Sequence, residues 1–191
     1  MPRRRALPLH TAGIDVARRG VIHHLTPLVQ SAIDRALARL GFAFAQSNQW
    51  EPSRACYEAL VSRFPQSPWL DEARFGMGWA LQSQKRYDDA VNLYTDLTHR
   101  TSAEPAAKAQ VNIGVCRIEQ KRPADALTAL LAVPLIYDYP DCSAAACYQA
   151  ARAHFDNQKP QEAADLLHRV VKEFPASEWA ALAQKRLAEM K

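Results

Sequence analysis

The chain has 191 residues, of which 48% are apolar, so it is long enough for one folded domain with a continuous core. It holds no run of the roughly 18 apolar residues that a membrane-spanning helix needs, which excludes direct membrane insertion. The formal net charge of +4 comes from residues 1–24, where five arginines accompany Asp15 alone. The remainder carries equal numbers of basic and acidic residues, so the sequence does not favour nucleic acid as a partner.

Residues 1–25 form a basic segment that differs from the rest of the chain. Its opening apolar run, Ala6 to Leu9, contains Pro8 and is shorter than the roughly seven residues of a secretory signal. We therefore expect a flexible arm, or the cut edge of a longer polypeptide. The chain as written is expected to be cytoplasmic, and periplasmic or in the cell envelope if it is a fragment of an exported protein.

The remaining residues repeat at a nearly constant interval. Gly41, Gly78, Gly114 and Ala151 each lie in an apolar helical stretch, 36 or 37 residues apart. A self-similarity of this length is typical of stacked helical hairpins, which indicates an all-α fold. Glycine inside a helix costs roughly 1 kcal/mol relative to alanine, so its recurrence indicates close helix packing rather than a phosphate loop.

Residues 26–191 are predicted to form one right-handed α-α superhelix of about four hairpins with a C-terminal capping helix. A threonine cap followed by Pro27 begins the first helix, which runs to about Ser47. Pro134 is expected to end the second helix of the third hairpin, because proline lacks an amide hydrogen. A final amphipathic helix is expected to cover the exposed apolar end of the stack. The predicted units are about 34–68, 69–104, 105–141 and 142–177, followed by the capping helix 178–191.

The sequence offers no catalytic or metal-binding set. Cys56, Cys116, Cys142 and Cys147 form no CxxC pair and lack zinc spacing, so we expect buried, reduced thiols, with a link from Cys142 to another cysteine as the alternative. Acidic pairs such as Asp88-Asp89 fall in first helical turns, where they meet the helix dipole. The sequence therefore predicts a protein that is not an enzyme and needs no cofactor or metal.

The second block reads LDEARFGMGWALQSQKRYDDAVNLYTDL, with Gly78, Tyr87, Ala90 and Tyr94 in order, and the fourth reads AARAHFDNQKPQEAADLLHRVVKEFP. From about residue 34 to 191 the chain resembles tetratricopeptide repeat (TPR) proteins. Its spacing exceeds their usual 34 residues, and RFPQSPWLDEA, DYPDCSAAA and EFPASEWAALA link the hairpins. In this it is similar to the branch that contains the bacterial outer-membrane assembly lipoprotein and the periplasmic protein accompanying the Tol-Pal system. That resemblance implies an exported envelope scaffold.

In the TPR family the first helix of each hairpin lines the concave surface, so the resemblance implies where a partner would bind. Many of the corresponding residues are aromatic or apolar and would suit an extended segment or an amphipathic helix. The alternative is that these side chains are core, or that residues 1–25 fill the groove. The implied contact residues are Arg39, Phe42, Phe75, Trp79, Gln82, Asn112, Val115, Ile118, Tyr148, Arg152 and Phe155.

Two functions remain open at this stage. The repeats and the lack of a catalytic set favour a protein-interaction scaffold that holds a peptide or helix of a partner. The alternative is a rigid spacer or self-association module that forms the C-terminal part of a larger envelope protein. Neither reading identifies the partner or the oligomeric state.

Overall fold

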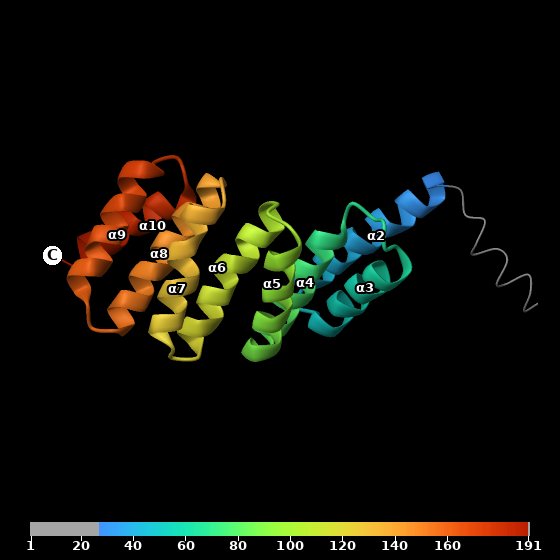
Figure 1. Ribbon diagram of the computed structural model, residues 1–191, viewed down its shortest axis with the longest axis horizontal. Coiled ribbons are helices and arrows are strands. Elements are labelled where there is room, and N and C mark those ends of the chain that lie inside the picture. The colour runs from blue at the N-terminus through green and yellow to red at the C-terminus, as the bar shows by residue number, and fades with distance from the viewer. Residues whose placement is uncertain (1–26, 191) are drawn as a thin grey trace, which may run out of the picture.

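The computed structural model describes residues 27–190, which form a row of helices along one long axis (Figure 1). The predicted basic arm, residues 1–25, and the Thr26 cap lie outside the described residues. Within the described range all regular structure is helical, as the sequence predicted. The helices are α2 Pro27–Gln46, α3 Trp50–Arg63, α4 Leu70–Ser83, α5 Tyr87–Arg100, α6 Glu104–Glu119, α7 Pro123–Ile136, α8 Pro140–Asp156, α9 Pro160–Glu173 and α10 Glu178–Glu189.

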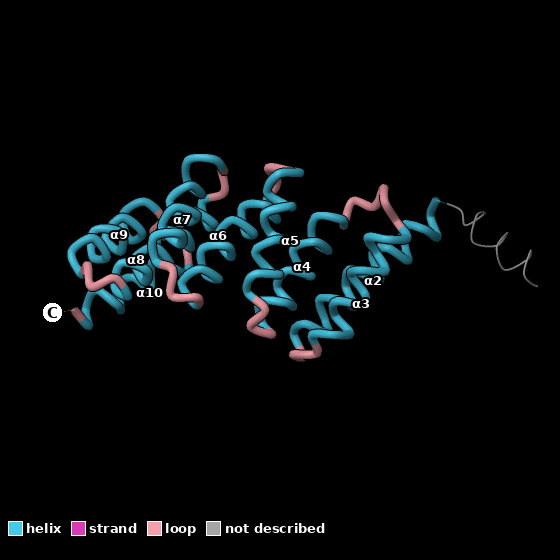
Figure 2. The backbone as a smooth tube through the Cα atoms, turned by 60° about the horizontal axis from the view of Figure 1, so that its bottom comes forward, coloured by secondary structure: helices cyan, strands magenta, loops and turns pink. Residues whose placement is uncertain are grey.

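Each helix packs against the next, and the first helices of successive hairpins also pack on one another. Thus α2 contacts α4, α4 contacts α6, α6 contacts α8, and α8 contacts α10. Within residues 27–190 the second helices α3, α5, α7 and α9 do not contact one another in this way. Because, in the described part of the chain, only the first helices also contact one another, the stack curves into a superhelix with these helices on its inner, concave side. Figure 2 shows the helices following one another along the row. The predicted fold class is confirmed.

The turns of all four hairpins share one backbone conformation. Asn48, Lys85, Lys121 and Gln158 have φ between 57° and 62°, and each follows the first helix of its hairpin. The next amide then donates back across five residues, for example from Arg86 N to Leu81 O at 2.9 Å. This left-handed residue with its long hydrogen bond satisfies carbonyls that the helix end leaves free. The repeat is therefore encoded in the turns as well as in the helix faces.

Helix α7 extends beyond the end that the sequence predicted for it. Pro134 lies inside the helix, which continues to Ile136, so the prediction that this proline ends it was wrong. Proline in the last turn removes one helical hydrogen bond, and the following turn is still closed by Tyr137 N donating to Val133 O at 3.0 Å. By contrast, Pro123 and Pro160 begin α7 and α9, in the first turn where proline is tolerated.

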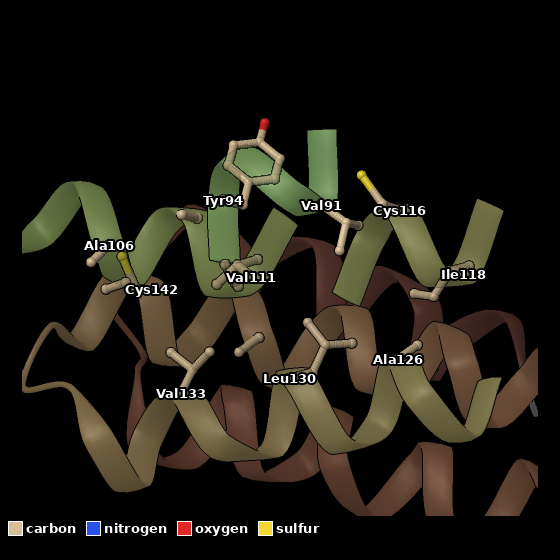
Figure 3. Close-up of a cluster of buried hydrophobic side chains, with 14 of the residues drawn as sticks. Val91, Tyr94, Ala106, Val111, Cys116, Ile118, Ala126, Leu130, Val133 and Cys142 are labelled. Carbon is tan, nitrogen blue, oxygen red and sulfur yellow. The ribbon is translucent and has the colours of Figure 1, made fainter. Parts of the chain in front are cut away.

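The core runs between the two helix layers, and its largest part joins α4 to α8 (Figure 3). Glycine allows the layers to approach closely. A Cβ added to Gly41 would lie 2.7 Å from the Tyr57 ring, and one added to Gly76 would also collide with that ring. Tyr57 of α3 is therefore inserted between α2 and α4. The predicted packing role of the glycines is confirmed.

The four cysteines are free thiols. Cys116, Cys142 and Cys147 are buried and Cys56 is partly buried, as expected of small apolar residues at helix contacts. Burial raises the pKa of Cys116 to about 12, because the charged thiolate would lose its hydration. The buried thiols are therefore held protonated at neutral pH.

Candidate protein-binding groove

A hollow of about 530 Å³ opens on the concave side, between α2, α4 and α6. Its wall is mostly apolar, and Phe42 at its edge is 55% exposed. Tyr57 reaches the hollow from α3, and burial raises the pKa of its phenol to about 12. The lining residues are Ala38, Arg39, Phe42, Tyr57, Trp69, Glu72, Phe75, Gly76, Trp79, Glu104, Pro105, Lys108 and Asn112.

A second hollow of about 260 Å³ continues toward the C-terminal end. It shares Phe75, Glu104, Lys108 and Asn112 with the first, so the two form one depression across the inner helices. We call this depression the inner groove. The second hollow adds Val111, Asp141, Cys142, Ala145, Glu178 and Trp179 to the lining.

Negative charge predominates along the inner groove. Lys108 is neutralised by Glu104 of the same helix, at 2.7 Å between Nζ and Oε1. Glu72 lies at the α4 side, and Asp141 with Glu178 at the far end, whereas Arg39 lies on α2. An apolar floor with carboxylates at its border suits a partner that carries large apolar side chains next to Lys or Arg.

The Tyr94 hydroxyl joins three helices beneath the groove. It donates to Gln82 Oε1 at 2.9 Å and accepts from Asn112 Nδ2 at 3.4 Å. The ring of Tyr94 also packs against Phe75, with centroids 5.7 Å apart. Burial raises the pKa of Tyr94 well above its usual value, which keeps the hydroxyl as a donor. Gln82 and Asn112 are therefore oriented by a structural hydrogen bond.

Five of the residues implied by the resemblance line the larger hollow: Arg39, Phe42, Phe75, Trp79 and Asn112. They come from α2, α4 and α6, and the inner position of those helices brings them together. Trp79 is held edge to face against Trp50 of α3, with centroids 5.7 Å apart and planes at 71°. The N-terminal half of the implied site is thus one continuous surface.

The C-terminal half is covered by α10. Tyr148 lies 5.3 Å from the Trp179 ring, measured between centroids, and the guanidinium carbon of Arg186 lies 5.0 Å from the centre of Phe155. Arg152 stays exposed and donates to Gln149 and to Glu119. Helix α10 thus packs on α8 as each first helix packs on the one before it, and Tyr148 and Phe155 are left partly buried.

Two further implied residues lie deeper than the groove. Ile118 is 3% exposed and belongs to the core that includes Cys116 and Leu130 (Figure 3). Val115 is partly buried against the same core. The structure places neither of them in the lining of the inner groove.

Several lining residues were missed by sequence reasoning. Glu104 and Lys108 lie two turns and one turn before Asn112, so helical spacing alone places them on the same face. Ala38 stands 37 residues before Phe75 and could have been found from the repeat. Tyr57 and Trp69 carried no such signal, because they lie outside the first helices.

The fold and groove together define a class, the α-α superhelix of helical hairpins. Models of the tetratricopeptide repeat match residues 75–140 in one case, and residues 35–67 and 145–177 in another. These ranges span more than half of the chain, which belongs to the tetratricopeptide repeat family. Repeats of this family generally mediate protein–protein interactions. The matching models do not single out the envelope branch.

Solved structures show the same fold at low identity. The TPR-like repeats of a Podosopora anserina protein assigned as a kinesin light chain match with a TM-score of 0.64 and 19% identity, over 84% of this chain and 85% of that one. A single-substitution variant of those repeats matches with a TM-score of 0.66 and 18% identity, over 87% of each chain. No curated protein matches the chain.

Among residues 27–190, His, Cys, Asp and Glu side chains gather nowhere in a group that could hold a metal ion. No helix in that range is both long and apolar enough to cross a membrane. The candidate site of the described residues is the inner groove.

Proposed function

We propose that this chain is a non-enzymatic scaffold that holds a segment of a partner protein in the inner groove. One observation supports the proposal most strongly: the larger hollow is open, apolar and aromatic, although it lies on the inner side of a stack whose core is otherwise closed. Exposed apolar hollows rimmed by charge are typical of protein-binding surfaces.

The lining suggests the chemistry of that segment. A large aliphatic or aromatic side chain would enter between Phe42, Phe75 and Trp79. A Lys or Arg further along would meet Asp141 and Glu178, which line the second hollow. Because Tyr148 and Phe155 are partly buried against α10, the aromatic contacts concentrate on α2 and α4.

The proposal is tested by selecting peptides of about 15 residues from a random displayed library on the full chain. We expect enrichment of peptides that join an aromatic or large aliphatic residue to Lys or Arg. Phe42→Ala should weaken a selected peptide by roughly 30-fold, the loss typical of an aromatic anchor. Phe42 suits the test because its side chain is more than half exposed, so its removal leaves the core intact.

Leu135→Ala is the matched control, since Leu135 is 84% exposed and lies on the second-helix layer. It should leave affinity unchanged. A library that yields no enriched peptide would count against the proposal, as would peptides that bind Phe42→Ala and the unaltered chain equally well. Either result would favour the alternative function, a spacer or self-association module.

A further inference from the structure

The outward face of α2 is apolar along most of the helix. Val29, Ile33 and Leu40 are 43%, 37% and 46% exposed, and Ala36 and Ala43 lie exposed between and beyond them. These five residues recur at steps of three, four or seven, so they share one face, which we call the α2 stripe. The outer face of a terminal repeat is normally polar, and that of α2 is not.

The equivalent face of the next first helix, α4, is packed against another helix. Leu70, Ala73 and Met77 of α4 stand 37 residues after Ile33, Ala36 and Leu40. In α4 these side chains pack on a cluster that contains Tyr57 and Leu60 of the preceding helix, α3. The same face that α2 exposes is therefore the face by which α4 receives a second helix of the hairpin before it.

The equivalent positions are also buried in the other first helices. Ala36 corresponds to Ala109 in α6, Ala146 in α8 and Ala183 in α10, which are all at most 1% exposed. Ala43 likewise corresponds to Ala80, Cys116 and Ala153, each 0% exposed. Among the described first helices, α2 is alone in leaving these positions open. The α2 stripe thus corresponds to the face by which each later first helix contacts the second helix of the preceding hairpin.

We propose that residues 12–23 of this same chain form a helix that covers the α2 stripe. Ile14, Ala17 and Val21 recur at steps of three and four, which gives this segment one apolar face. Three residues would then join it to α2, as three residues join α5 to α6 and α7 to α8. The proposed helix takes the part that α3 plays for α4.

The register of the segment supports this pairing. In the second and third hairpins, Ala90 and Tyr94 precede Ala109 by 19 and 15 residues, and both belong to the core that holds Ala109. Ala17 and Val21 precede Ala36 by the same 19 and 15 residues. The side chains that would contact the stripe are therefore spaced as they are between α5 and α6.

A second copy of the chain is a weaker occupant. The stripe belongs to one helix of 20 residues, about 30 Å long and about one side chain wide. That surface is far smaller than the roughly 800 Å² per partner of a stable dimer. A segment joined to α2 by three residues is tethered, with an effective concentration on the order of millimolar, so a small interface suffices for it.

Cysteine pairs in the full chain test the contact directly. Val21→Cys with Ala36→Cys should form an intramolecular disulfide under mild oxidation by diamide, located by peptide mapping. The matched pair is Val16→Cys with Ala36→Cys, because Val16 lies on the opposite face of the proposed helix. We expect the first pair to close at least about tenfold faster, since only it brings the two Cβ atoms within disulfide range. Equal rates would overturn the proposal.

Amide hydrogen exchange provides a second measurement that needs no cross-link. Val21→Asp should raise exchange of the α2 amides by about tenfold or more, because it removes an apolar contact from the stripe, whereas Val16→Asp should leave α2 unchanged. Indistinguishable variants would contradict the proposal. So would a dimer mass in solution that Ile33→Asp converts to monomer, because a second copy would then cover the stripe.

Discussion

The ring of Tyr94 lies directly against the backbone of Gly78, sixteen residues earlier in the same hairpin. A Cβ added to Gly78 would stand 2.5 Å from Tyr94 Cε1. The same spacing joins Gly41 to Tyr57, and Gly114 to Leu130. In the fourth hairpin the pair is Ala151 with Leu167, both buried. Each hairpin thus brings a small residue of its first helix against a large side chain sixteen residues later.

Gly78→Ala should therefore destabilise the protein by about 1–3 kcal/mol, the cost of overpacking. Helix propensity alone predicts the opposite sign, a gain of about 1 kcal/mol. Urea unfolding followed by circular dichroism measures the difference.

Tyr94→Leu provides the control background, because it removes the ring that a Cβ at position 78 would meet. In that background Gly78→Ala should destabilise the protein less than it does in the unaltered chain. Equal destabilisation in both backgrounds would show that the ring of Tyr94 is not what excludes a methyl group at position 78.

Tyr94→Phe should cost about 0.5–1.5 kcal/mol, because it removes the hydroxyl that joins Gln82 to Asn112. Gln82→Ala measured in both backgrounds completes a double-mutant cycle. We expect the two losses to be less than additive, since either change breaks the same 2.9 Å hydrogen bond. Strict additivity would mean that this bond does not stabilise the stack.

The thiols should react in the order of their burial. Cys56 is partly buried, whereas Cys116, Cys142 and Cys147 are 0%, 5% and 1% exposed. At neutral pH an alkylating reagent should modify Cys56 at least about tenfold faster than the others, which react only on opening of the fold. Mass spectrometry of peptides assigns each site. In denaturant the four rates should converge, and a native protein in which another cysteine reacts first would contradict this order.

Stability should fall at alkaline pH because of Cys116. Its thiol pKa is 9.0 in a model peptide and about 12 in the fold, where burial excludes the thiolate. Below pH 9 both states are protonated, so the full stability is present. As pH rises from 9 toward 12, only the unfolded chain loses the proton, and the free energy of unfolding decreases.

Cys116→Ala removes this group, so its free energy of unfolding should decline less steeply between pH 9 and 12. The variant starts from lower stability because of the cavity it leaves, and therefore the slope against pH is the quantity to compare. Identical slopes would show that another group governs alkaline unfolding, Tyr57 among them, whose pKa is raised to about 12.

Local and periodic features could be predicted from the sequence, whereas long-range contacts could not. The spacing of Gly41, Gly78 and Gly114 indicates the hairpins, because close packing needs a small residue once per repeat. Tyr148 lies 37 residues after Val111 and has the same register as Phe75, so it was expected in the groove. Its ring instead packs against Trp179 of α10. The periodicity of the repeats does not predict how this last helix packs on the one before it.

The start of α7 could be predicted from the local sequence, whereas its end could not. Pro123 begins the helix as a local rule requires. Pro134 does not end it: the helix continues through Leu135 and Ile136, although both side chains are exposed, and Tyr137 N still donates to Val133 O. Ile118 likewise follows the groove register but is drawn into the core between α6 and its neighbours.

The left-handed residues of the hairpin turns should respond to glycine by an amount that depends on the residue replaced. Lys85 and Lys121 have φ of 62° and 60°, a left-handed conformation that costs a residue with a Cβ roughly 1–2 kcal/mol. Lys85→Gly and Lys121→Gly relieve that cost but lose more entropy on folding, which leaves an expected gain of about 0.5–1 kcal/mol each.

Lys85→Ala is the control, because alanine keeps the Cβ and should gain nothing. Asn48 has the same conformation, φ 57°, yet asparagine tolerates it, so Asn48→Gly should gain less than Lys121→Gly. Thermal unfolding of the four variants ranks them. If alanine stabilised as much as glycine at position 85, the gain would come from loss of the lysine side chain, and the left-handed turn would carry no strain that the repeat has to offset.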